Sequence, residues 1–267
     1  MIRKLEEKDR ETVLAFVGDR PSENVFIIGD IEQFGFGSRT VSLWGDFDQD
    51  DHLRSMLLRF AGNFIPYARD PKQFDGEAWA RQIEQTGRLK MISGLKELTD
   101  KLTPFITRPE KQRKLCYYAR RENVLPLDGD ARMREVRMLF PEESDAVIRL
   151  WSEIPEFTGS METAETLQKN MENGFSRTYY IEKDDAPVSA VSTTAETASA
   201  AMIVGVCTKK AYEHHGFATA CLRKMIHVLK SEHKQPCLFY DNPEAGKIYR
   251  QLGFVSIGLW AITSFIS

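Results

Sequence analysis

Segments that suit β-strands alternate with segments that suit helices, and the same order of elements occurs twice along the 267 residues. In residues 1–125 the order is strand, two helices, three strands, helix, strand, helix, strand. Residues 126–267 repeat it after a polar, turn-like stretch around 120–130. Because a domain usually holds about 100–200 residues, the sequence predicts two domains of mixed α+β class.

Composition argues against several classes of protein. The chain has 36 Lys and Arg against 39 Asp and Glu, a net charge of −3, whereas a general nucleic-acid binder has a basic excess. The apolar runs are far shorter than the roughly 20 residues of a membrane span. Glu6 and Glu7 stand where a signal peptide has its apolar region. We therefore expect a cytoplasmic protein that binds neither nucleic acid nor membrane.

The four cysteines contain no CxxC pair, which argues against a zinc ribbon. Three of them stand in apolar runs, where a free cysteine acts as a small buried hydrophobe. The sequence therefore predicts reduced thiols and no metal, in a reducing compartment.

A strand, a short polar loop and the start of a helix follow one another in residues 206–222. The first turn of a helix has unpaired backbone N–H groups and favours negative charge. Gly216 and Ala218 leave room for a phosphate there. Many α/β proteins carry this pattern without such a site, so it is only a candidate. Three side chains add a hydroxyl or positive charge: Thr219, His214 and His215.

A second segment, residues 238–254, reads as a strand followed by a helix. Asn242 is a natural N-cap, Pro243 suits the first helical position and Gly253 suits the position after the helix end. Tyr249 lies two turns into this helix, and capping does not explain it. A tyrosine there is as often a core or interface residue.

Together the two segments resemble the GNAT acetyltransferase superfamily. Its usual patterns are V-x-x-x-x-x-[QR]-x-x-G-x-[GA] and, after one helix and one strand, N-x-x-A-x-x-x-Y-x-x-x-G-F. The resemblance covers about residues 132–267. Glu213 stands at the Gln or Arg position of the first pattern. A carboxylate there would repel a diphosphate. The matching residues are Val206, Gly216, Ala218, Asn242, Ala245, Tyr249, Gly253 and Phe254.

The resemblance implies tandem GNAT-like domains, each with a mixed central sheet flanked by helices. Residues 126–267 would be the acetyltransferase domain. Residues 1–125 would be a degenerate GNAT-like or accessory α+β domain, because residues 68–72 contain no small-residue helix start. That half would not bind a second coenzyme A.

The resemblance also implies transfer of an acetyl group from acetyl-CoA to a small-molecule or peptide amine by direct attack. Tyr249 would be the general acid that protonates the leaving thiolate, and Glu196 or Glu153 would be the base. Backbone groups of Val206 and Thr208 would bind the pantetheine arm, which Asn242 would also contact. The pyrophosphate would lie against His214, His215, Gly216, Phe217, Ala218 and Thr219.

Two other functions stay open. The acid at Glu213, and the lack of an acid in residues 202–207, suit a catalytically inactive coenzyme A-binding regulatory protein. A structural relic that binds nothing is the third interpretation. The sequence leaves the acceptor amine unidentified, and it leaves a homodimer open.

Overall fold

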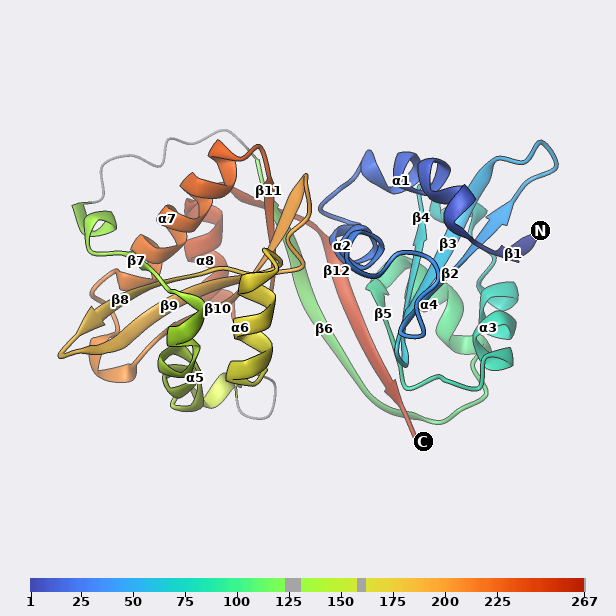
Figure 1. Ribbon diagram of the computed structural model, residues 1–267. Coiled ribbons are helices and arrows are strands. Elements are labelled where there is room, and N and C mark those ends of the chain that lie inside the picture. Colours follow the sequence, from blue (N-terminus) through green and yellow to red (C-terminus); the bar gives the residue numbers. More distant parts are fainter. Residues whose placement is uncertain (123–130, 158–161, 267) are drawn as a thin grey trace. The chain divides into compact units, whose positions relative to one another are not determined.

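The structure is a computed structural model that describes residues 1–122, 131–157 and 162–266 (Figure 1). The chain divides into two compact units. The first comprises Met1–Tyr118, Phe239–Asp241 and Ser256–Ser267, and the second comprises Ala119–Leu238 and Asn242–Val255. This differs from the predicted division at 125/126, because the C-terminal strand segment joins the first unit.

The first unit is a mixed sheet with the strand order β1-β2-β3-β4-β5, continued by the last part of β12. β4 and β5 are parallel, and the pairs β1–β2, β2–β3, β3–β4 and β5–β12 are antiparallel. The elements are β1 (Ile2–Lys4), α1 (Arg10–Gly18), α2 (Val25–Phe34), β2 (Val41–Phe47), β3 (Leu53–Phe60), β4 (Asn63–Ala68), α3 (Gly76–Gln85), β5 (Met91–Leu95), α4 (Lys96–Leu102), β6 (Glu110–Arg121) and β12 (Phe254–Phe265).

Alternation along β4 explains why helices flank both faces of this first sheet. Phe64 belongs to a buried cluster with Trp79 of α3 and Leu98 of α4. Tyr67, on the opposite face of the strand, meets the ring of Phe16 from α1 edge-on at 5.5 Å. At β4, each face of the sheet is therefore apolar and covered by helices.

The second unit is a mixed sheet with the order β7-β8-β9-β10-β11, in which β10 and β11 are parallel. In Figure 1, α5 and α6 lie on one side of this sheet and α7 on the other. The elements are β7 (Arg137–Met138), α5 (Ser144–Ser152), α6 (Ala164–Glu172), β8 (Thr178–Lys183), β9 (Ala186–Thr194), β10 (Ala200–Thr208), α7 (Phe217–Ser231), β11 (Gln235–Tyr240) and α8 (Pro243–Gln251).

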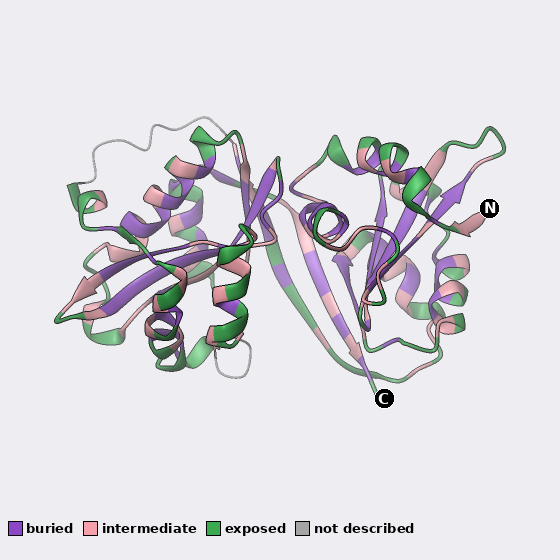
Figure 2. Cartoon of the chain, in the orientation of Figure 1, coloured by how far each residue is buried: buried purple, intermediate pink, exposed green. Residues whose placement is uncertain are grey.

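Both units match the predicted α+β class with mixed sheets between helices, which is confirmed. Buried residues concentrate on the strands and on the sheet-facing sides of the helices (Figure 2). All four cysteines are buried and unbridged, as expected. No helix in the described ranges is long and apolar enough to span a membrane.

The structure differs from the sequence prediction at the expected first strand of the second half. Residues 132–138 are expected as a strand, but Ala131–Arg134 forms a 3-10 turn and only Arg137 and Met138 pair with β8. The weak alternation in this stretch reflects a turn whose polar side chains stay in solvent. The expected helix cap at Ser160 lies outside the described residues, and Thr163 caps α6 by accepting from the N–H of Thr166.

Candidate functional site

Strands β10 and β11 stop pairing part-way along their length. Their parallel register runs from Ala200 opposite Gln235 to Ile203 opposite Leu238, whereas β10 continues to Thr208. A strand edge that has lost its neighbour presents backbone donors and acceptors, and an extended ligand can pair with them. The end of β10 is therefore a natural docking edge for a chain-like ligand.

A bulge in β10 produces this separation. The pairing register with β9 shifts between Val204 and Cys207, and Gly205 inside the bulge has φ +61°. A Cβ atom at Gly205 would lie 3.0 Å from the indole ring of Trp151. Only glycine suits that conformation and that space, and a bulge bends its strand away from a neighbour.

Helix α7 begins without a side-chain cap. Its N-cap residue is Gly216, in the left-handed conformation with φ 79°, and no side chain accepts from the first turn. The N–H groups of Phe217, Ala218 and Thr219 therefore keep their hydrogen-bonding capacity, and the dipole of a 15-residue helix adds positive potential. This geometry suits an anion at the helix start.

Arg132 lies against this loop, and sequence reasoning did not find it. Its Nη1 donates to the carbonyl of His215 at 2.6 Å, and its guanidinium lies next to the Cα of Gly216. Eighty-three residues separate the two positions, so no local pattern connects them. Arg132 brings a fixed positive charge to a loop in which Glu213 brings a negative one.

Replacing Gly216 with alanine is expected to weaken this arrangement. A Cβ there would collide with the Arg132 guanidinium, and the left-handed backbone costs an alanine about 1 kcal/mol. We expect a lower free energy of unfolding, measured by urea unfolding. Gly18→Ala is the matched control, because nothing lies within 4 Å of its Cβ position. Equal effects of the two variants would contradict this role.

Helix α8 brings the second motif to the same place. Asn242 is its N-cap, with Oδ1 accepting from the N–H of Glu244 at 2.9 Å, as the sequence predicts. Tyr249 is 7% exposed, and its ring meets Phe254 edge-on at 6.0 Å. Capping and packing thus orient the helix so that one of its faces borders the end of β10.

The end of β10, the start of α7 and one face of α8 together enclose a pocket of about 580 Å³. Nine of the predicted site residues line it: Val206, Thr208, His214, Gly216, Phe217, Ala218, Thr219, Asn242 and Tyr249. The other lining residues are Cys207, Tyr212, Glu213, Leu222, Glu244, Ala245, Lys247, Ile248 and Gln251. Of these, only Glu213 and Ala245 had been singled out by the motifs.

His215 does not line the pocket. Its ring stacks on Phe217 with centroids 5.6 Å apart, and its Nδ1 lies 2.8 Å from the carbonyl of Glu213. These contacts stabilise the loop, so His215 shapes the anion site through the backbone instead of facing the ligand. Lys209, which could offset the acid of Glu213, instead pairs with Glu153 at 2.9 Å.

Glu196 is not at the pocket, and the base role predicted for it is not supported. Its carboxylate is buried and accepts two bonds from Arg177 at 2.7 Å and one from Lys234 at 2.8 Å. Burial raises its pKa, but bonds from Arg177, Lys234 and Thr193 outweigh burial and hold the pKa below the usual value. A carboxylate held this way stabilises the fold and is a poor proton acceptor.

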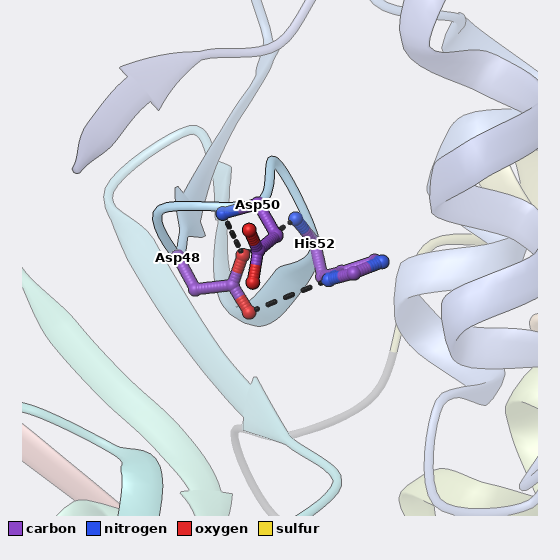
Figure 3. Close-up of side chains that lie close together, drawn as sticks. All are labelled: Asp48, Asp50 and His52. Carbon is purple, nitrogen blue, oxygen red and sulfur yellow. Dashed lines mark hydrogen bonds and ion pairs between the residues drawn. The ribbon is translucent and has the colours of Figure 1, made fainter.

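The turn between β2 and β3 also gathers possible metal ligands, Asp48, Asp50 and His52, whose ligand atoms lie within 4.8 Å of one another (Figure 3). Asp48 Oδ1 accepts from the backbone N–H groups of Asp50 and His52 at 2.9 Å each. Those bonds, chiefly the one from His52, lower the pKa of Asp48. The cluster is explained as a hydrogen-bonded turn.

Residues 159–262 match the family model of the GNAT acetyltransferase. No curated protein matches the sequence. Among solved structures, the chain is similar to a GCN5-related N-acetyltransferase from Sphaerobacter thermophilus, with a TM-score of 0.63 and 11% identity over 98% of this chain and 94% of the other. It is also similar to an acetyltransferase from the GNAT family of Colwellia psychrerythraea, with a TM-score of 0.56 and 12% identity over 100% of both chains.

A tandem GNAT protein from the clavulanic acid biosynthesis pathway is a third similar structure, with a TM-score of 0.59 and 12% identity over 98% of this chain and 97% of that one. At these identities the likeness establishes the fold, and it confirms the two-unit GNAT-like arrangement expected from the sequence. The sequence match includes the open strand edge, the uncapped helix start and Tyr249 of the second unit. Residues 159–262 thus match the GNAT acetyltransferase family model, and the chain has the fold of the similar GNAT structures.

Proposed function

We propose that the protein is an N-acetyltransferase that transfers an acetyl group from acetyl-CoA to a small-molecule or peptide amine. The observation that carries this proposal is the single pocket of about 580 Å³ shared by the open edge of β10, the start of α7 and Tyr249. The edge suits the amide-containing pantetheine arm, and the helix start suits the pyrophosphate. Two phenols line the pocket. The hydroxyl of Tyr212 donates to Asp184 at 3.1 Å, so we assign the protonation of the thiolate to Tyr249.

In the proposed reaction the amine nitrogen attacks the thioester carbonyl and forms a tetrahedral intermediate. The C–S bond then breaks, the Tyr249 hydroxyl gives its proton to the sulfur, and the amine proton passes to water. The products are an acetylated amine and free coenzyme A. Neither predicted base lines the pocket, since Glu196 is buried in its ion pairs and Glu153 pairs with Lys209, so we assign no side chain to that step.

The experiment is a thiol-release assay of the full chain with acetyl-CoA and a panel of primary amines, run beside a thermal-unfolding titration. A ligand that binds only the folded state stabilises it by about 2.7 kcal/mol at 100 times its Kd. We expect both a thermal shift with acetyl-CoA and release of thiol with at least one amine. Absence of any shift at saturating acetyl-CoA would overturn the proposal.

A catalytically inactive coenzyme A-binding protein is the second candidate, and Glu213 is the observation that favours it. This acid faces the pocket where the family pattern has Gln or Arg, and a carboxylate repels a diphosphate. Stabilisation by both acetyl-CoA and coenzyme A without thiol release from any amine would support this alternative. Glu213→Gln should then tighten binding without creating turnover.

A further inference from the structure

The N-terminal unit carries a basic hollow that has no part in the proposed reaction. Two overlapping cavities of about 490 and 470 Å³ share Arg39, Arg59 and Arg88. We call the two together the basic groove. It is lined by Lys4, Ser38, Arg39, Thr40, Ser42, Trp44, Arg59, Ala61, Gly62, Thr86, Gly87, Arg88 and Lys90.

The charge of the basic groove is one-sided. Its lining holds no carboxylate, and none of its cations has an ion-pair partner among the residues that the structure describes. Arginines elsewhere in the same unit do find partners: Arg54 pairs with Asp46 at 2.7 Å and Arg69 with Asp19 at 2.9 Å. The cations in question are Lys4, Arg39, Arg59, Arg88 and Lys90.

Arg59 is the buried centre of this groove, at 5% exposure. Its guanidinium donates to the hydroxyl of Ser42 and the carbonyl of Ala61, both at 2.7 Å, and to the carbonyl of Arg39 at 3.3 Å. All these acceptors are neutral, and burial together with the nearby Arg88 lowers the pKa of Arg59. A buried cation without a counter-ion is costly, and a bound anion would offset that cost.

The sheet brings these residues together from distant parts of the chain. Ser42 of β2 lies opposite Arg59 of β3, and Trp44 lies opposite Lys4 of β1, so these side chains share a face. Arg88 comes from the segment between α3 and β5. The half-buried Trp44 adds an apolar wall beside the cations.

Hydroxyl groups complete the donor set. Ser38 Oγ accepts from the backbone N–H groups of Thr40 and Val41 at 3.0 Å, and Ser42 Oγ accepts from Arg59. Each hydroxyl therefore keeps its proton for another acceptor. Guanidinium forks and hydroxyl donors around one hollow match the several acceptor oxygens of a phosphate.

We propose that the basic groove binds a small phosphate ester with a flat organic part, its phosphate among Arg39, Arg59 and Arg88 and its organic part against Trp44. All lining residues belong to Met1–Tyr118, so this site is separate from the pocket proposed for acetyl-CoA. Binding there does not depend on the proposed function.

The test is isothermal calorimetry of the full chain with adenosine monophosphate, inorganic phosphate and adenosine, at matched ionic strength because salt screens exposed charges. We expect the monophosphate to bind tighter than inorganic phosphate and adenosine to give no heat. Arg39→Gln and Arg88→Gln each remove one exposed cation. Each variant should bind adenosine monophosphate with an affinity roughly tenfold lower than that of the parent chain. Lys111→Gln is the matched control, an exposed cation of the same unit outside the groove.

Three results would overturn the proposal. The first is no heat from either phosphate compound at millimolar concentration. The second is unchanged affinity in Arg39→Gln and Arg88→Gln, which would place the monophosphate elsewhere, for instance in the pocket of the C-terminal unit. The third is a Trp44→Leu variant that binds the monophosphate as tightly as the parent chain, which would exclude the ring contact.

Discussion

Tyr249→Phe is expected to lower kcat of acetyl transfer about 100- to 10,000-fold, the range typical for loss of a general acid. The substitution removes one hydroxyl and keeps the ring that packs edge-on against Phe254. Acetyl-CoA affinity should stay close to that of the parent chain, because the strand edge and the start of α7 are untouched. Steady-state thiol release and calorimetry with acetyl-CoA separate the two effects.

The matched control is Tyr117→Phe, a tyrosine that is 47% exposed and outside the pocket. It should leave turnover unchanged. Full activity in Tyr249→Phe would remove the hydroxyl from the mechanism. A parallel loss of acetyl-CoA affinity and kcat would instead indicate that Tyr249 serves mainly to shape the pocket.

Glu196→Ala is expected to cost about 3–5 kcal/mol of unfolding free energy, the usual effect of removing one partner from a buried ion pair. The carboxylate is 1% exposed as a side chain and pairs with Arg177 and Lys234. Without it, Lys234 keeps a longer ion-pair contact of 3.4 Å to Glu232. Urea unfolding of parent and variant measures the loss. Glu165→Ala, an exposed acid at the start of α6, should change stability little.

The same ion pairs predict a pH dependence. The pKa of Glu196 is lowered in the folded protein, so its contribution is fully present above the ordinary glutamate pKa of 4.5 and is lost as pH falls through the folded-state pKa. The stability difference between parent and Glu196→Ala should therefore shrink on acidification below about pH 4.5. A difference that stays constant down to pH 3 would contradict this assignment.

Local signals predicted the parts of the site that depend on neighbouring residues. Asn242 and Pro243 start α8 as their residue types predict, and the helix expected after Gly216 begins at Phe217. A cap, a proline and a left-handed glycine act over three or four residues, so a single sequence shows them. The family resemblance implied that Tyr249 serves the same site, and Tyr249 lines the pocket together with Val206 and Gly216.

The ion-pair and hydrogen-bond partners that charged side chains find in distant segments could not be predicted in this way. Glu196 was a candidate base, yet its carboxylate accepts hydrogen bonds from Arg177 and Lys234. Arg132 lies 83 residues from the loop that it braces. The choice of partner for a charged side chain depends on sheet order and burial, which no short pattern encodes.

The sequence by itself therefore determined the class of the elements, their repeated order and the residues at the start of α7 and α8, because propensity and capping are local. Only the tertiary structure decided that the chain's last strand segment pairs with β5 of the first unit, that β10 separates from β11, and that unpaired cations gather around Arg59. These features depend on which strands become neighbours, and long-range packing sets that choice.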